Sequence, residues 1–407
     1  MNKTVSRRRF NQGLMSTGVA SIATTLPVFS HSRWDLSEDL NQAKKWLSTK
    51  IETQELWLSA QGRDKDNYSL GWINPEAKSS SQQLSNFRGH GLCQNPIQPE
   101  HVVMFSRRPG THGIRLNTTS GEIDALFHSI EDRYMQGHGC YSADGKWLYC
   151  TESSINTGEG KITVRNASTL EQVNEFSSYG IGPHEVKLMP DGFTLVVANG
   201  GLLTHPDSGR KILNLDTMRA TLSYIDSRNG ELISEHLLSS PKASIRHLDV
   251  AKDGTVAIAL QVQREAMSSN KIVPLAAIHK PGHKLGKKSV QPLQELHAPE
   301  ALMVKLNDYM GSVVIHNETR LAAFTSPKGD LAMFWHLDDL SLQGYHAFHD
   351  VCGLTISQDK KYFVLSNSAG KVRQINTRTL KINKEKSLHF PEKSWDNHML
   401  SILNSHT

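Results

Sequence analysis

Four histidines stand at the same place in a recurring stretch of the sequence, six or seven residues before a tight turn. A cysteine takes that place in the last copy, and the five residues are His90, His138, His184, His247 and Cys352. Imidazole nitrogen and thiolate sulfur are ligands that zinc, copper and iron prefer. If the fold brings these positions together, we expect a transition metal, Fe, Cu or Zn, to bind there. The alternative is that the histidines are polar residues bonded to water or to neighbouring backbone.

The densest polar stretch of the chain covers residues 199–218. Its side chains offer imidazole, carboxylate, guanidinium and amide groups, on His205, Asp207, Arg210, Asn214 and Asp216. Arg246 adjoins His247, and Glu152 lies in the corresponding loop of the preceding copy. Arg107 and Arg108 lie in the corresponding loop of the copy that begins at residue 90. Loops on a rigid scaffold often carry binding residues, so this set predicts a site for a small polar ligand or a metal complex. The alternative is that the Gly-Gly and Pro-Asp-Ser-Gly pieces only form turns.

Each copy of the repeat is predicted to form a short strand, a tight turn and a second apolar strand. The copies begin at residues 90, 138, 184, 247, 311 and 352, and are therefore 41 to 64 residues apart. Asp-Gly between alternating apolar runs, as at Asp144-Gly145 and Asp191-Gly192, is a strong hairpin signal. Two further strands follow in several copies, for example over residues 162–165 and 171–176. Strand repeats of about 40–50 residues are typical of propeller blades.

We therefore predict an all-β fold, a single β-propeller of seven four-stranded blades over residues 51–407. The copies supply six blades, and the seventh combines residues 52–74 with the tail 394–403, so that strands from both termini close the ring. Closure removes the exposed edges of an open sheet. Six or eight blades, or a pair of β-sandwiches, are the alternatives. In a propeller the inner strands begin at one face and the loops between second and third strands return to it. The residues named above would therefore surround one mouth of the central channel.

Residues 1–30 are predicted to be an export signal. The run Ser6-Arg7-Arg8-Arg9-Phe10 precedes a short, mildly apolar stretch that reaches Val28. The paired arginines resemble those of twin-arginine signals. The stretch is too short and interrupted to span a bilayer, so we predict a periplasmic protein with no transmembrane segment in the mature chain. Residues 31–50 are expected to form a short helix that leads into the propeller. A basic amphipathic helix of a cytosolic protein is the alternative for the N-terminus.

The positive charge of the chain lies mainly in that N-terminal segment. The formal net charge is +5, and residues 1–30 hold four basic and no acidic residues, which leaves +1 for the rest. A nearly neutral body excludes nucleic acid as a partner, because phosphate binding needs a concentrated basic surface.

Cysteine use and known motifs limit the functions further. Four cysteines are few for a protein built on disulfides, although Cys140 and Cys150 flank a turn and a disulfide between them is possible. The sequence has no G-x-S-x-G, H-E-x-x-H, P-loop or C-x-x-C motif. Glu185 follows His184, but neighbours on a strand point to opposite faces, so these two are not expected to act together.

Several motifs resemble those of one bacterial family. They include Gly182-Pro-His-Glu, Pro190-Asp-Gly, Thr204-His-Pro-Asp, Leu213-Asn-Leu-Asp-Thr-Met and Ser244-Ile-Arg-His. Over residues 50–390 the chain resembles twin-arginine-exported, YVTN-like propellers of unknown function, whose genes often accompany imelysin-type iron-uptake proteins. The resemblance implies a periplasmic propeller linked to iron acquisition, with iron-uptake proteins as partners. It supplies no activity and no catalytic residues.

Three functions fit these observations. The first is a periplasmic binding or accessory protein that holds a metal, a metal complex or a small polar ligand at the histidine-lined mouth. The second is a metal-dependent enzyme, a lactonase-like hydrolase or an oxidoreductase, that uses the same mouth. The third is a protein-interaction scaffold whose partner docks on the blade loops.

Overall fold

The fold was analysed in a computed structural model, which describes residues 53–62, 65–282 and 293–405. Ile51–Thr407 form one compact unit. The predicted signal peptide, residues 1–30, and the helical segment, residues 31–50, lie outside the described residues. In the part of the chain that is described, no helix is long and apolar enough to cross a membrane.

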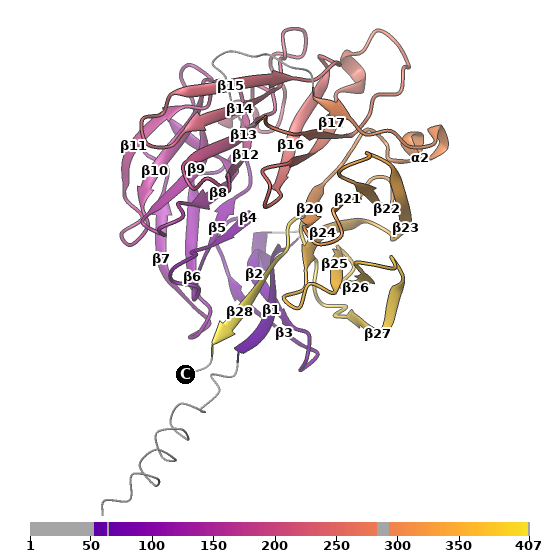
Figure 1. Cartoon of the computed structure of the whole chain (residues 1–407). Helices are drawn as coiled ribbons and strands as arrows, with labels where there is room; N and C mark the ends of the chain where they lie inside the picture. The colour runs from indigo at the N-terminus through magenta and orange to yellow at the C-terminus, as the bar shows by residue number, and fades with distance from the viewer. Residues whose placement is uncertain (1–52, 63–64, 283–292, 406–407) are drawn as a thin grey trace, which may run out of the picture. The chain divides into compact units, whose positions relative to one another are not determined.

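The described residues form seven antiparallel sheets of four strands each, which confirms the predicted propeller (Figure 1). From the inner strand outward, the first three blades along the chain are β4 (Gly89–Gln94), β5 (His101–Ser106), β6 (His112–Asn117) and β7 (Glu122–His128); β8 (Arg133–Tyr141), β9 (Trp147–Ser154), β10 (Gly160–Asn166) and β11 (Gln172–Ser177); and β12 (Pro183–Leu188), β13 (Thr194–Asn199), β14 (Thr221–Asp226) and β15 (Leu232–Leu237).

The next three blades follow the same order. They are β16 (Ala243–Val250), β17 (Val256–Val262), β18 (Ala276–His279) and β19 (Gln294–Glu295); β20 (Ser312–His316), β21 (Leu321–Ser326), β22 (Leu331–His336) and β23 (Leu342–Ala347); and β24 (Val351–Ile356), β25 (Tyr362–Asn367), β26 (Lys371–Asn376) and β27 (Ile382–His389). The few helical turns described are η1 (Lys65–Asn67), η2 (Pro206–Ser208), η3 (Arg264–Ala266) and α2 (Glu300–Lys305).

The seventh blade joins the two ends of the propeller. It consists of β28 (Leu400–Ser405), β1 (Thr53–Gln61), β2 (Ser69–Asn74) and β3 (Ser79–Leu84), with β28 antiparallel to β1. The inner strand β28 lies beside β24 on one side and β4 on the other. The predicted closure is therefore confirmed. Strand β3 was not predicted, because its sequence Ser-Ser-Ser-Gln-Gln-Leu does not alternate apolar and polar residues. It needs no such pattern, since it forms a largely exposed outer edge of its sheet.

The core of the propeller lies between adjacent blades. The second strands are buried on both faces, and all six residues of β13 are buried. Outer strands alternate, as in β23, where exposed and half-buried residues take turns. This gradient follows from the fold, because the inner three strands are covered by neighbouring blades while the fourth borders solvent.

At the start of the inner strands, the register of pairing with the second strand shifts. The shift falls between Gly89 and Leu92 in β4, Met135 and Gly139 in β8, Pro183 and Glu185 in β12, Ile245 and His247 in β16, and Val351 and Leu354 in β24. Bulges of this kind re-aim side chains and are common beside functional sites. Strand β20, in contrast, pairs with β21 in continuous register from Ser312.

The disulfide between Cys140 and Cys150, which the sequence left open, does not form. All four cysteines are free thiols. Cys140 lies opposite Tyr149 in the β8–β9 register, so Cys150, the next residue, points to the other face of the sheet. The two thiols accordingly belong to different core clusters, on opposite sides of this blade.

Ile402 tests whether β28 holds the ring closed. Its side chain is fully buried against Leu56, Leu58 and Met104. We expect Ile402→Ala to lower the free energy of unfolding by about 2–5 kcal/mol, because it leaves a cavity at the closure. The adjacent Leu403 is 45% exposed, so Leu403→Ala should change it by less than about 0.5 kcal/mol. Urea unfolding followed by circular dichroism makes the comparison, and equal effects would show that β28 does not seal the fold.

A candidate metal centre

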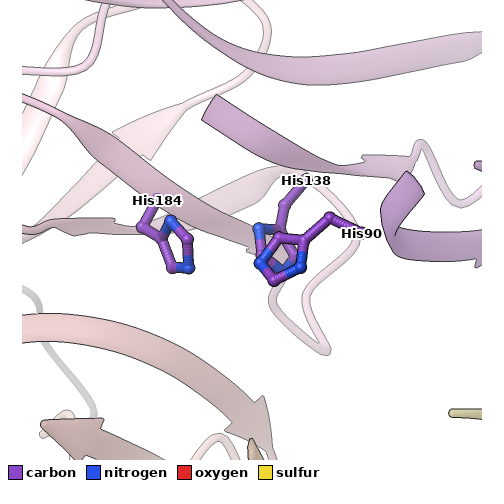
Figure 2. Close-up of side chains that lie close together, drawn as sticks. All are labelled: His90, His138 and His184. Carbon is purple, nitrogen blue, oxygen red and sulfur yellow. The ribbon is translucent and has the colours of Figure 1, made fainter. Parts of the chain in front are cut away.

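Five imidazole rings converge beside the bulged segments of the inner strands. His90, His138, His184 and His247, the four predicted histidines, meet a fifth, His398, which precedes β28. Going round the set in that order and back to His90, neighbouring ring centroids are 4.8, 4.7, 4.7, 4.5 and 4.6 Å apart. Figure 2 shows the first three rings close together, each carried by a different strand. Residues up to 308 positions apart in the sequence therefore share one site.

The bulges and two glycines allow this close approach. His90, His138 and His184 all lie within the shifted registers, which turn them away from the regular ladder. Gly137 has a φ of +110°, and a Cβ there would come within 2.8 Å of the His90 ring. A Cβ on Gly91 would come within 2.6 Å of the Gly137 carbonyl oxygen. Only glycine fits both requirements at position 137.

Two overlapping groups of nitrogen atoms have the spacing of metal ligands. One nitrogen each from His90, His138 and His184 lie within 4.8 Å of one another, and so do those of His138, His247 and His398. In the second group, Nε2 of His138 faces Nε2 of His398 at 3.1 Å. Two nitrogens bound to one tetrahedral ion at about 2.0–2.1 Å would be about 3.3 Å apart. This pair is therefore already close to ligand geometry.

A buried carboxylate orients His247. Glu185 Oε2 lies 3.2 Å from His247 Nδ1 and also accepts a hydrogen bond from the Leu248 backbone N–H at 3.1 Å. Its other oxygen pairs with Lys187 Nζ at 3.2 Å. Burial alone would raise the pKa of Glu185, but the charge of Lys187 and the hydrogen bond from His247 hold it well below its usual value. An ionised Glu185 can only accept, so Nδ1 of His247 carries the proton and Nε2 presents its lone pair to the cluster.

The expectation that His184 and Glu185 do not act together needs a correction. The two side chains do diverge, but Glu185 reaches the next blade and contacts His247, while His184 joins the ring cluster. Both residues thus belong to one site. The alternation rule failed to show this because His184 is the bulged residue, and because the partner of Glu185 is on another strand.

His184 is held differently from the other four. Arg246 Nη2 donates a hydrogen bond to His184 Nδ1 at 3.1 Å. The neutral ring then carries its proton on Nε2, so His184 binds a metal through Nε2 only after this contact is released. The group His138, His247 and His398 has no such obstacle. It is therefore the better ligand set of the two.

All five imidazoles are kept neutral. Burial lowers the pKa of His138 to about 3, and lowers those of His90, His184 and His398 well below the ordinary value. Burial also lowers the pKa of His247, although Glu185 opposes the shift. Neutral imidazole is the form that binds metal. Nδ1 of His90 and Nδ1 of His138 are buried without a hydrogen-bond partner among the described residues.

A wider chamber opens over the cluster. A cavity of about 10 Å³, enough for one ion or water, touches His90, His184 and His247 as well as Arg108, Arg210, Arg246 and Tyr309. It shares Arg107, Arg108, Arg210, Gln261, Tyr309 and Asn397 with a chamber of about 750 Å³. The chamber is large enough for a small molecule next to the histidines.

Of the predicted ligand residues, Arg210 and Arg246 reach the site and the others do not line it. His205 and Asp207 interact with each other at the start of η2, where Asp207 is exposed. Asn214 bonds the backbone of Gly201 and Leu203, which holds the long loop together. Asp216 is exposed. Glu152 is fully buried within its blade, in an ion pair with Arg165 at 3.1 Å.

Cys352 occupies the predicted place in β24 but stays outside both nitrogen groups. Its Sγ lies 3.3 Å from the Trp395 carbonyl oxygen and 3.7 Å from that of Ser366. Burial raises the pKa of this thiol, so it is protonated and donates to those oxygens. His398 takes the ligand place that the sequence predicted for Cys352.

His398 and Asp396 are the site residues that the sequence analysis missed. Asp396 pairs with Arg88 and Arg107 at 3.1 and 3.2 Å and lies 4.0 Å from His90. A signal for His398 was available, because it stands just before the inner strand of the seventh blade, whereas the other four histidines lie within theirs. Nothing in the local sequence marks Asp396, whose partners lie about 300 positions away.

These features define a class: a seven-bladed β-propeller with a histidine cluster carried by its inner strands and by the segment before β28. Comparison with known families then shows that the chain belongs to the family described as "Protein of unknown function (DUF1513)", which matches residues 83–402. This confirms the predicted membership of a family of unknown function. The export route and the link to iron-uptake proteins stay predictions.

Other comparisons support the fold alone. None of the curated proteins matches this sequence. Among solved structures, the hydrazine synthase of Kuenenia stuttgartiensis is similar, with a TM-score of 0.59 and 14% sequence identity, over 78% of this chain and 91% of that chain. At that identity the likeness concerns architecture, and function has to be argued from the site.

Acidification should destabilise the metal-free protein. Unfolded histidine binds a proton with a pKa near 6.5, whereas folded His138 stays neutral down to about 3. Between pH 6.5 and 5 the unfolded state therefore binds more protons, and stability falls as pH falls, by about 1.4 kcal/mol per pH unit for each such group. Urea unfolding in the presence of a chelator measures the slope. His138→Gln should flatten it by about one proton, and His389→Gln, on an exposed residue, serves as the control. An unaltered slope in His138→Gln would contradict the assignment.

Proposed function

We propose that the protein binds a transition metal ion, Fe, Cu or Zn, through the histidine cluster. The observation that carries the proposal is the convergence of five neutral imidazoles from five blades, with His138, His247 and His398 presenting nitrogens within 4.8 Å of one another. Three imidazoles with room beside them form a common type of open metal site. His90 and His184 flank this set and can complete the coordination.

The chemistry of the site supports a metal over a water-filled polar channel. A channel residue needs only one or two hydrogen bonds, and its surroundings need not fix the tautomer. Here Glu185 fixes the tautomer of His247, and the carboxylate–histidine pair is the usual outer support of a metal ligand. The facing Nε2 atoms of His138 and His398 require one ring to donate when no ion is present. A shared ion uses both lone pairs.

The biological role that fits this site is that of a periplasmic binding or accessory protein in the acquisition of iron or another metal. The twin-arginine motif Ser6-Arg7-Arg8-Arg9-Phe10 and the family resemblance support export to the periplasm. Twin-arginine export carries folded cargo, so the metal can be loaded before export. Periplasmic iron-uptake proteins are the partners we propose.

A metal-dependent enzyme is the second candidate, and the chamber favours it. Catalytic metal sites keep a coordination position open to substrate, and about 750 Å³ of space adjoins the cluster. Tyr309, Gln261 and Asn397 line that space and offer hydrogen bonds. Turnover of lactones or redox substrates by the metal-loaded protein, lost when the ligands are replaced, would assign the enzyme.

Loss of the central ligands should abolish metal binding. Protein prepared without a polyhistidine tag is stripped with chelator and titrated with Zn²⁺, Cu²⁺ and Fe²⁺ by calorimetry, with elemental analysis after dialysis. We expect stoichiometric binding of at least one metal, and at least a 100-fold weaker affinity in the His138→Ala/His247→Ala double variant, because two of three ligands are removed.

Two further variants make the result specific. His349→Ala removes an exposed imidazole and should leave the affinity unchanged. Glu185→Gln keeps all five histidines but loses the ionised acceptor at His247, so the affinity should fall about 10- to 100-fold. Binding that is equal in the wild type and the double variant would refute the proposed site, and so would the absence of binding for all three metals.

A further inference from the structure

The chamber above the histidines is lined by more positive than negative charge. Five basic side chains line it, Arg107, Arg108, Arg210, Arg264 and Lys328, against two acidic ones, Glu265 and Asp308. A sixth basic side chain, Arg246, lies in the small cavity beneath. The body of the chain is nearly neutral, so this concentration of charge is local. A cleft lined by one sign of charge attracts ligands of the other.

The chamber arginines differ in whether the protein neutralises them. Arg264 forms a two-fold ion pair with Asp308, at 2.6 and 2.8 Å. Arg107 pairs with Asp396, which it shares with Arg88. Among the described residues, no carboxylate pairs with Arg108, Arg210 or Arg246. Three guanidinium groups around one cavity are thus left without an anion.

Two of these three guanidinium groups are buried, and burying a charge without an ion-pair partner costs free energy of folding. Arg108 is 8% exposed and Arg246 is 3% exposed. Nη1 of Arg108 and Nε of Arg246 are buried with no hydrogen-bond partner among the described residues. A buried charge is normally paired, because burying it alone costs several kcal/mol. Both residues line the cavity, so an anion bound there would pair with them.

The electrostatics of Arg108 agree with an anion site. Burial, together with the nearby Arg210, lowers the pKa of Arg108 to about 10. An anion bound beside Arg108 would reverse this effect, since it stabilises the charged form.

We propose that the chamber binds a small ligand that carries more than one oxyanion group, carboxylate or phosphate, held by Arg108, Arg210 and Arg246. Guanidinium forks match these planar or tetrahedral oxyanions with paired N–H···O bonds. The chamber volume of about 750 Å³ exceeds the needs of a single inorganic ion and fits a molecule with several such groups.

This ligand would lie directly against the histidine cluster. The small cavity is bounded by Arg108, Arg210 and Arg246 on one side and by His90, His184 and His247 on the other. An anion there would offset the repulsion between a bound metal cation and the arginines. The anion site itself rests only on the arginines, so it does not depend on the proposed metal function.

Calorimetric titration of the metal-free protein tests the proposal. The probes are tricarballylate and citrate for carboxylates, pyrophosphate for phosphates, and sucrose as a neutral control, in low salt. We expect binding of at least one anionic class, with affinity falling as salt rises from 20 to 200 mM, because salt screens the attraction between the anion and the exposed Arg210. The class that binds identifies the source of the oxyanions. Absence of binding for every anion, or equal binding of sucrose, would overturn the proposal.

Variants locate the site and separate it from the metal centre. Arg210→Gln, on an exposed residue, and Arg108→Gln should each weaken anion binding at least ten-fold. Arg264→Gln is the matched control, since this arginine lines the same chamber but is already paired with Asp308. Metal affinity measured without anion should not fall in Arg210→Gln, because the substitution removes a positive charge that repels the cation. Anion binding unaffected by both Arg108→Gln and Arg210→Gln would refute the assignment, whatever the metal result.

Discussion

The pairing of β28 with β1 is the constraint on which the rest of the molecule depends. It joins the last inner strand to blade strands from the other end of the chain, and Ile402 seals the contact in the core. The same segment delivers His398 to the imidazole cluster and Asp396 to Arg88 and Arg107. Closing the ring and completing the site are thus one event, because the segment just before β28 carries the fifth histidine of the cluster. Stability and the proposed function are coupled through a few C-terminal residues.

Charge is arranged around the cluster in layers. The five imidazoles are neutral, since burial disfavours their protonated forms. Behind them, Glu185 is ionised and held by Lys187, so the carboxylate reaches His247 as an acceptor. In front of them, unpaired guanidinium groups line the way to solvent. A cation fits the lone pairs and an anion fits the arginines, so the two proposed ligands are complementary rather than competing.

Much of this could be predicted, because a propeller repeats its signals. Asp-Gly turns and alternating apolar runs recur in each copy, so the blades, their number and the mouth that carries the histidines followed from local patterns. The polar strand β3 was not predicted, since a strand at the outer edge of a sheet needs no alternation of apolar residues. The long loop at residues 199–218 was judged by composition, yet only Arg210 of its predicted residues lines the chamber. Composition shows that a loop is polar, and only packing shows which side chains face the site.

The sequence by itself determined the fold class, the closure by both termini and four of the five clustered histidines, because these depend on short-range turns and strand periods. Tertiary structure decided the rest. In the folded protein His398 lies in the cluster and Cys352 does not. Cys140 and Cys150 point to opposite faces of their sheet, and Glu185 contacts His247 on another blade. Tertiary structure also left Arg108 and Arg246 buried with no carboxylate partner among the residues that the structure describes. The physical reason is that bulges and contacts between blades set where a side chain points, and neither is encoded in the spacing of residues along one strand.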